Sequence, residues 1–182
     1  LTRGIDVDSL PTFDIEFLFL NIRAKSIGED IKMTVTCPDD KTTKVDLVVY
    51  VDEIKVTKPK DHTTDIVLDD KMTLRMKYPS LNQFVNSNFN VDDDPESVVD
   101  KTFQVVADCI DQVYTGEDAW DARDYSPSER MDFVSQLSSK QYKKVEKFFD
   151  TMPKLSHTIE FVNPNTKQKN SVVLEGLADF FG

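Results

Sequence analysis

Glycine is scarce in this chain, which has five glycines among 182 residues. Nucleophile elbows, phosphate-binding loops and dinucleotide-binding fingerprints all require glycines at fixed spacings, because their backbone must turn sharply or approach a ligand closely. None of those spacings occurs here. The sequence therefore lacks the common enzyme signatures that depend on glycine.

Cysteine and histidine are rarer still, with two of each: Cys37, Cys109, His62 and His157. A zinc site needs about four such ligands, commonly in closely spaced pairs. Cys37 lies in the stretch CPDDK without a second cysteine three residues on, and neither histidine has a paired ligand spacing. We therefore expect no metal and no cofactor. We expect Cys37 to be a half-buried residue at a strand end, Cys109 to lie on a helix, and both histidines to occupy exposed loops or strand edges. Two unpaired cysteines also suit a reducing cytoplasm.

Long apolar runs are missing as well. No stretch approaches the roughly 18 apolar residues that cross a bilayer, and no basic-then-apolar leader opens the chain. We expect neither a membrane span nor a signal peptide. The first residue is Leu1 and not Met, so a native start upstream of Leu1 stays open.

Positive charge is in short supply, because 22 basic residues face 33 acidic ones and the net charge is −11. Such a chain repels a phosphate backbone, so we expect no nucleic acid partner. The acidic residues gather in two clusters: Asp92, Asp93, Asp94 and Glu96, then Glu117, Asp118, Asp121 and Asp124. We interpret both as solvated loop or helix-start residues, with a surface for a basic partner as the alternative. A calcium loop would also need a central Gly and a terminal Glu at the loop spacing, which are absent after Asp92.

Apolar residues are plentiful, at 39% of the chain with 12 Phe, which is enough for a sizeable core. The stretch TFDIEFLFLNIRAKSIGED places Phe13, Phe17, Leu20 and Ala24 on one helical stripe. Neighbouring apolar residues widen that stripe, so we expect a helix buried on more than one side. Alternation from Phe13 to Phe19 would also fit a strand, but Gly28 lies where a helix would stop.

Alternating segments follow this helix. IKMTVTC (31–37) and VDLVVYVDEIKV (45–56) flank the turn-like PDDKTTK and predict a β-hairpin. DIVLDDKMTLRMKY (65–78) predicts one or two more strands. Together they indicate a small antiparallel sheet.

A helical block is expected next. YPSLNQFV (78–85) begins it, and PESVVDKTFQVVADCIDQVY (95–114) continues it with Pro95 in the first turn and Gly116 beyond the end. That second helix carries its apolar residues at steps of four, three, four and three: Val99, Phe103, Val106, Ile110 and Val113. Capping boxes predict two more helix starts, Ser126 with Glu129 and Ser138 with Gln141. The last helix has an apolar face of Tyr142, Val145, Phe148 and Met152 and ends at Pro153.

A second hairpin, Thr158 to Val162 and Ser171 to Leu174, and an apolar tail close the chain. Its turn NPNTK repeats CPDDK at an interval of 126 residues. This interval pairs Pro38 with Pro164, Lys41 with Lys167 and Val48 with Leu174.

Blocks of strands and helices in this order predict an α+β fold, with a small antiparallel sheet of β-hairpins and a block of about four to five helices. We expect three segments that form one compact unit. Residues 1–91 hold the first helix and the sheet, 92–154 the helical block, and 155–182 a hairpin and tail that pack back on the first segment.

Three stretches resemble one known family: FDIEFLFLNIRAKSIGED, the CPDD turn, and IEFVNPNTKQKNSVVLEGLADFF. They are similar to the baseplate hub subunit, or hub assembly protein, of T-even-type contractile-tailed bacteriophages, over about Phe13 to Phe181. The family pattern S-x-G-E corresponds to residues 26–29, and G-L-x-D-F-F to residues 176–181. Relatives often carry Cys-x-x-Cys at these hairpin turns, whereas this chain keeps Cys37 alone.

The resemblance implies a late viral protein that builds the baseplate hub in the host cell cytoplasm. Our leading hypothesis is a non-enzymatic, chaperone-like assembly factor that binds other hub or tail proteins, including the tape-measure protein. We predict partner contact through Leu177, Phe180 and Phe181, because aromatic residues give large contact areas. The alternative is that these three residues pack onto the first helix.

Two other functions stay open. The chain could be a permanent structural subunit of the virion tail baseplate, a homo-oligomer arranged symmetrically about the tail axis. It could also be a tail-associated cell-wall hydrolase with a carboxylate pair, although no flanking pattern singles out such a pair.

Overall fold

The computed structural model describes residue 4, residues 6–80, residue 83 and residues 95–181. The chain divides into two compact units. Unit 1 comprises residues 1–12 and 59–152, and unit 2 comprises residues 13–58 and 153–182. These bounds differ from the three segments expected above, because the long middle stretch is an insertion between the two halves of unit 2.

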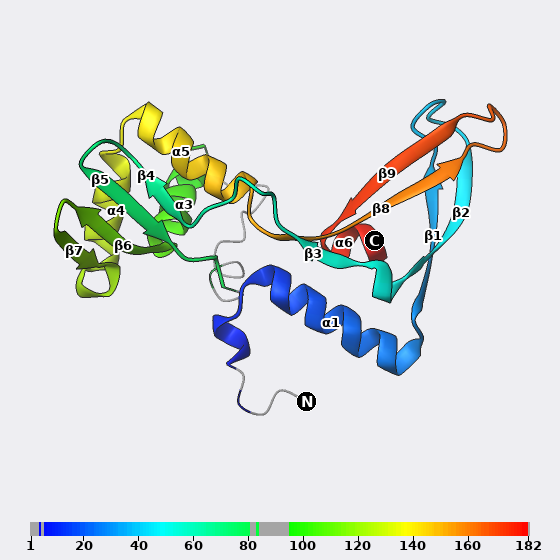
Figure 1. Cartoon of the computed structure of the whole chain (residues 1–182), viewed down its shortest axis with the longest axis horizontal. Coiled ribbons are helices and arrows are strands. Elements are labelled where there is room, and N and C mark those ends of the chain that lie inside the picture. The colour runs from blue at the N-terminus through cyan, green and yellow to red at the C-terminus, as the bar shows by residue number, and fades with distance from the viewer. Residues whose placement is uncertain (1–3, 5, 81–82, 84–94, 182) are drawn as a thin grey trace. The chain divides into compact units, whose positions relative to one another are not determined.

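The fold is α+β, as expected (Figure 1). The strand pairings of the described residues are all antiparallel. They form three separate sheets, ordered β1-β2, β3-β8-β9 and β4-β5-β6-β7, instead of the one small sheet that we expected.

Unit 1 builds a four-stranded meander and covers it with helices. Its elements are η1 (Val7–Ser9), β4 (Asp65–Val67), β5 (Met72–Met76), α3 (Pro95–Asp108), β6 (Ile110–Thr115), β7 (Asp118–Asp121), η3 (Ala122–Asp124), α4 (Pro127–Ser135) and α5 (Ser139–Asp150). Leu74 of β5, Val134 of α4 and Val145 of α5 are among its fully buried core residues. The core thus joins the sheet to α4 and α5.

The expected helix over residues 95–114 is wrong beyond Asp108. Ile110 and Val113 lie in β6, which pairs with β5 and β7. Arg75 is opposite Gln112 but Met76 is opposite Ile110, so Asp111 is an extra residue in β6. A bulge of this kind shifts the alternation of side chains by one position, and Ile110 and Val113 both reach the core of unit 1. Their spacing of three therefore imitates a helix, and Gly116, with φ +65°, lies in the β6–β7 turn.

Both predicted capping boxes are confirmed. Ser126 and Glu129 begin α4, and Ser138 and Gln141 begin α5, with reciprocal side-chain and backbone hydrogen bonds in each pair. The structure also places Pro127 just inside α4. Local polar chemistry was sufficient to locate these two helix starts.

The expectations for the two histidines are wrong. His62 is buried, and its Nδ1 and Nε2 atoms lie 2.9 Å from Thr151 Oγ1 and 2.9 Å from the Tyr78 hydroxyl. Its ring also stacks on Tyr78, at 5.6 Å between centroids. His157 is partly buried in β8, the middle strand of its sheet. Both histidine side chains therefore pack against other residues of the unit to which they belong.

Unit 2 is assembled from the two ends of the chain. Its elements are α1 (Thr12–Ile27), β1 (Asp30–Thr36), β2 (Lys44–Tyr50), η2 (Val51–Glu53), β3 (Lys55–Thr57), β8 (Lys154–Val162), β9 (Lys169–Glu175) and α6 (Gly176–Phe181). Its buried core takes Leu20 from α1, Ile31 and Val49 from the first hairpin, and Leu155 and Leu174 from the second. Residues more than a hundred positions apart thus share one core.

Helix α1 is confirmed, but it is not buried on more than one side. Phe13, Leu20 and Ala24 form the buried stripe, whereas Phe19 and Ile22 are exposed. The apolar residues that widened the stripe in the sequence therefore leave an apolar surface on the outer side of this helix.

The two hairpins of unit 2 are a structural repeat. β1–β2 pairs residues 30–36 with 44–50, and β8–β9 pairs 156–162 with 169–175, in the same register. Lys41 and Lys167 both have positive φ, +57° and +62°, and each donates its N–H to the carbonyl four residues earlier, at 2.9 Å. The alignment of the two turns is therefore confirmed.

The interval of 126 residues no longer aligns the two hairpins beyond their turns, because the second turn is one residue shorter than the first. The N–H of Cys37 bonds to Thr43 O, six residues on, whereas that of Asn163 bonds to Gln168 O, five residues on. The counterpart of Leu174 is therefore the buried Val49, and Val48 corresponds to the exposed Val173. The pairing of Val48 with Leu174 was wrong by one residue.

Two of the sequence expectations fall on parts that are not described. The acidic residues 92–94 and half of YPSLNQFV (residues 81, 82, 84 and 85) lie outside the described residues, as does the side chain of Glu96. In the second acidic cluster, Asp118 and Asp121 belong to β7, and Asp121 is also the N-cap of η3, so the cluster includes a strand as well as the expected helix start. Asp121 accepts a hydrogen bond from the N–H of Arg123 at the start of η3.

A candidate partner-binding groove in unit 2

The C-terminal helix α6 is fixed to α1 at its first residues. Gly176 begins α6 with φ +70°, and a Cβ atom there would lie 3.4 Å from Glu16 Oε1. Glu16 accepts a hydrogen bond from the N–H of Leu177, and the N–H of Glu175 donates to Asp179 Oδ2 at 2.8 Å. Burial raises the pKa of Glu16, and the bond from Leu177 opposes this rise. These contacts orient the two phenylalanines that follow.

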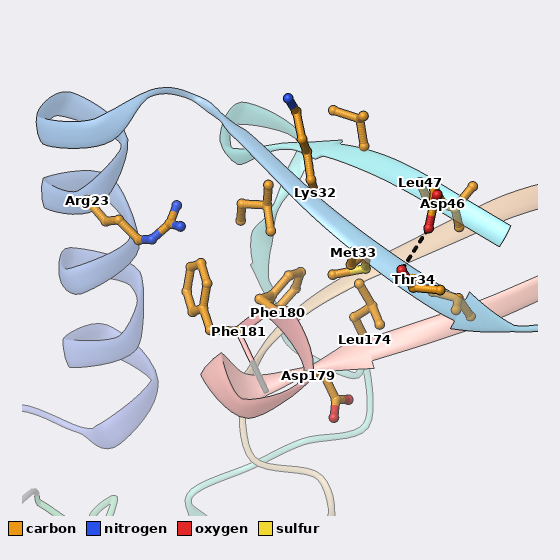
Figure 2. A pocket seen from close by; sticks show the side chains of 13 residues that line it. Arg23, Lys32, Met33, Thr34, Asp46, Leu47, Leu174, Asp179, Phe180 and Phe181 are labelled. Carbon is orange, nitrogen blue, oxygen red and sulfur yellow. Dashed lines mark hydrogen bonds between the residues drawn. The ribbon is translucent and has the colours of Figure 1, made fainter. Parts of the chain in front are cut away.

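Phe180 and Phe181 occupy different environments. Phe180 is buried in the core of unit 2, and Leu177 packs partly buried against the same core. Phe181 packs edge-to-face on Phe19 of α1, with centroids 6.3 Å apart, and the Arg23 guanidinium lies 4.4 Å from its ring centroid. Figure 2 shows Arg23 and Phe181 pointing toward each other. The tail therefore packs onto the first helix, which was the alternative considered for these residues.

An open groove of about 750 Å³ borders this packed tail (Figure 2). α1 contributes Arg23 to its lining, β1 contributes residues 31–35, β2 contributes residues 46–48, and α6 contributes residues 179–181. Its apolar side chains include Met33, Leu174 and Phe181. The groove thus joins an apolar floor to a rim of charged side chains.

The rim carries both signs of charge. Arg23 and Lys32 are its basic residues, and Asp46 and Asp179 its acidic ones. Thr34 Oγ1 donates to Asp46 Oδ1 at 2.7 Å, which fixes that carboxylate (Figure 2). Mixed charge around an apolar centre is typical of a protein-binding surface.

Backbone also borders the groove. Residues 31–35 of β1 are consecutive lining residues, although side chains of a strand alternate between its two faces. Within the described part of the chain, β1 pairs with β2 and with no other strand. One edge of β1 therefore offers main-chain hydrogen-bonding groups next to the groove.

The two hairpin turns of unit 2 meet in a polar cluster, which we call the turn junction. It consists of Asp39, Asp40 and Thr43 from the first turn and Asn163, Asn165 and Thr166 from the second. Asn163 Nδ2 donates to Asp39 Oδ1 at 2.8 Å and to Asp40 Oδ2 at 3.0 Å. Asn165 Nδ2 donates to Thr43 Oγ1 at 2.8 Å, and Thr166 Oγ1 donates to Asp39 Oδ2. Hydrogen bonds therefore join the repeated turns directly.

Charge at the turn junction is stabilised by these bonds. Hydrogen bonds from Thr166 and Asn163 lower the pKa of Asp39, and hydrogen bonds from Thr43, Thr42 and Asn163 hold the pKa of Asp40 well below its usual range. Both carboxylates thus remain ionised acceptors over a wide pH range.

Cys37 lies beside the turn junction, where its N–H donates to the carbonyl oxygen of Thr43. It is fully buried, not half-buried as expected, and burial and the nearby Asp40 and Asp39 raise its pKa. A protonated thiol is a poor ligand and a poor nucleophile. In the described residues, no group of three or more His, Cys, Asp or Glu side chains is placed to hold a metal ion. The buried Cys109, directly after α3, has its pKa raised by burial to about 12.

The sequence predicted an apolar tail where the structure has helix α6, and it predicted no groove. Leu177, Phe180 and Phe181 were named for their large apolar side chains, and the structure brings Phe180 and Phe181 to the groove. Arg23, Lys32 and Asp46 were missed, because their proximity depends on how the first hairpin packs against α1 and α6. The periodicity of β1 indicated which side chains face inward, but not which strand edge stays open.

The family model for T4 bacteriophage base plate protein matches residues 1–182. The chain belongs to this family. No curated protein and no solved structure matches it.

Membership of this family confirms the resemblance to base plate proteins of T4-type phages and makes the chain a phage base plate protein. Within the described residues of this base plate protein, no helix is both long and apolar enough to cross a membrane.

Proposed function

We propose that this base plate protein is an assembly factor of the baseplate hub, which binds other hub or tail proteins without catalysing a reaction. We place its action in the host cytoplasm during tail assembly, with the tape-measure protein among its candidate partners. The groove beside α6 carries this proposal, because it combines an apolar floor, a charged rim and an open strand edge.

Each of these three features has a known use in protein recognition. An extended segment of a partner would add a strand to the open edge of β1, since an unpaired edge presents free N–H and C=O groups. An apolar side chain of that segment would cover Met33 and Phe181 on the groove floor. The rim charges would select the partner and its orientation.

The titratable groups support a binding role over a catalytic one. The pKa of Asp40 is strongly lowered by hydrogen bonds within a turn, and that of Asp121 by hydrogen bonds and an ion pair with Arg123. Both carboxylates thus have structural partners that account for their low pKa values. The cell-wall hydrolase considered above would need a carboxylate with a raised pKa beside a second, ionised one. Glu16 has a raised pKa, but it too has a structural partner, because it accepts a hydrogen bond from the N–H of Leu177 at the start of α6.

The repeat supplies a matched pair of variants for testing the groove. Val48 and Val173 hold equivalent positions in the two hairpins and are 49% and 54% exposed, but Val48 alone of the two lines the groove. Tagged Val48→Asp and Val173→Asp proteins would be expressed in infected cells and their captured companions identified by mass spectrometry. We expect Val48→Asp to lose its hub partner and Val173→Asp to retain it.

Equal capture by both variants would refute the groove as the binding surface. Mass spectrometry of purified mature particles distinguishes the assembly factor from a permanent hub subunit. A stoichiometric amount of this protein in the particle would favour the permanent subunit.

A further inference from the structure

The open edge of β1 presents the main-chain groups of alternate residues. At the two ends of the β1–β2 ladder, the N–H of Cys37 donates to Thr43 O and the N–H of Val51 donates to Glu29 O. Hydrogen-bonded and non-hydrogen-bonded pairs alternate along an antiparallel ladder, so the odd-numbered residues of β1 bond to β2. The N–H and C=O groups of the even-numbered residues therefore point away from β2. These residues are Asp30, Lys32, Thr34 and Thr36.

The side chains of β1 alternate between the two faces of the sheet with the same period. Ile31 is buried in the core of unit 2 and Met33 packs against that core, so the odd-numbered side chains face inward. The even-numbered side chains are exposed, and Figure 2 shows Lys32 and Met33 on opposite sides of the strand. The exposed residues that can bond through their main chain at the edge are thus mostly polar or charged.

A second copy of β1 would satisfy this edge if it ran antiparallel with Met33 at the centre of the pairing. In that register each even-numbered residue lies opposite an even-numbered residue of the second copy, so each such pair exchanges two main-chain hydrogen bonds. On the inner face Met33 lies opposite Met33 of the second copy, and Ile31 lies opposite Val35. Apolar side chains therefore meet apolar ones along the whole inner face.

The same register makes the charges complementary. Lys32 would lie opposite Thr34 of the second copy, and Asp46 of the second copy pairs with that threonine on β2, in the same row across the strands. Because threonine is short, the long side chain of Lys32 would reach Asp46 across it. Lys32 makes no ion pair with another described residue. The next row joins Asp30 to Lys44 of the second copy in the same way.

We propose that two copies of this chain pair through the open edges of β1, in the antiparallel register centred on Met33. Their β1–β2 hairpins would join into one continuous sheet, and a two-fold axis would relate the copies, so that every contact occurs twice. The pairing needs no hub protein and therefore goes beyond the proposed function. A hub segment placed on the same edge would compete with the second copy.

The variant Met33→Cys tests the register. Residues at the centre of this pairing form a non-hydrogen-bonded pair with Cα atoms about 4.5 Å apart, which suits a disulfide. The two native cysteines are buried, so mild oxidation of the purified variant should give a dimer linked through the introduced thiols. Val35→Cys is the matched control on the same face, because its two copies would be about 13 Å apart along the strands and should not be linked.

Reversal of single charges tests the partner. Sedimentation velocity would measure dimerisation at physiological ionic strength, which screens the mutual repulsion of two chains of net charge −11. Lys32→Glu and Asp46→Lys should each weaken dimerisation by about tenfold or more, because two symmetry-related attractions become repulsions. A mixture of these two variants should dimerise like the parent, since each carries the charge that the other lacks. Lys25→Glu changes the net charge equally but alters a residue that pairs with Glu29, so it should leave dimerisation unchanged.

Three outcomes would overturn the proposal. They are a parent chain that stays monomeric at every concentration while Met33→Cys forms no linked dimer, equal linkage of Met33→Cys and Val35→Cys, and a mixture of the two charge variants that is no more dimeric than either alone. The charge variants alter exposed side chains, so they test the pairing even if Met33→Cys does not fold. These experiments contain no hub protein, and their result is independent of the capture experiment with Val48→Asp.

Discussion

Replacing Asn163 by alanine should loosen unit 2 at the turn junction. The side chain of Asn163 is fully buried and takes part in four hydrogen bonds. Its Nδ2 donates to Asp39 and Asp40, and its Oδ1 accepts from the N–H groups of Asn165 and Thr166 at 2.8 and 3.3 Å. Alanine removes all four bonds and leaves two backbone donors without a side-chain acceptor.

The expected magnitude follows from how well water replaces each bond. A typical hydrogen bond contributes about 0.5–1.5 kcal/mol net to stability. Asp39 is exposed and regains water easily, whereas the N–H groups of Asn165 and Thr166 are partly shielded. We therefore expect a loss of about 2–3 kcal/mol in the free energy of unfolding. For a unit of fewer than 100 residues this corresponds to a fall of about 10–20 °C in Tm.

Chemical denaturation followed by circular dichroism would measure the change. Asn21→Ala is the control, because Asn21 is an exposed residue of α1 with one local bond to Phe17 O, and it should change stability by less than about 0.5 kcal/mol. Asn163→Asp should be worse than alanine at pH 7, since it sets a third carboxylate beside Asp39 and Asp40, and it should recover as that carboxylate is protonated. An Asn163→Ala protein as stable as the parent would refute the idea that the turn junction holds the hairpins together.

Three other perturbations give distinct expectations. The pKa of Asp40 is lower in the folded protein than its ordinary value of 3.8, so the ionised carboxylate stabilises the fold at pH values above 3.8. This contribution is lost as the pH falls from 3.8 through the lower pKa of the folded protein. Urea unfolding between pH 7 and pH 2 should therefore show a shallower acid loss for Asp40→Asn than for the parent, and parallel curves would contradict this. Glu16 has a raised pKa, so its ionisation opposes folding as pH rises above about 4.5. Glu16→Gln should raise Tm at pH 7 but not at pH 4, and an equal effect at both values would exclude this cause. Phe180→Ala should lower the free energy of unfolding by about 3–5 kcal/mol. Phe181→Ala should lower it by less, because Phe181 is only partly buried. Equal losses in the two variants would mean that Phe180 is not the anchor of α6.

Local chemistry in the sequence was sufficient for most elements of the fold. Capping boxes located α4 and α5, and alternation located β1, β2, β8 and β9. The errors arose where the conformation of a segment depends on the strands with which it pairs. Ile110 and Val113 keep helical spacing, but β5 and β7 on either side and the bulge at Asp111 make this segment a strand. Burial of His62 depends likewise on Tyr78 and Thr151, which no local pattern connects to it.

The candidate sites were less accessible to sequence reasoning. Leu177, Phe180 and Phe181 were found by composition, but their contact with a partner stays a prediction. The open edge of β1 is a property of the folded structure, because it depends on the absence of a further strand beside β1 among the described residues. Such a feature leaves no periodicity in the chain.

The discontinuous make-up of unit 2 has a consequence for synthesis. Residues 13–58 leave the ribosome well before residues 153–181, which supply the strands and the helix that complete their core. Unit 1 is contiguous apart from its first twelve residues and is free to fold in the interval. Until translation reaches the second hairpin, β1 and β2 expose Ile31 and Val49 to solvent. Premature chain termination or a stalled ribosome would therefore leave a fragment that is prone to aggregation and proteolysis.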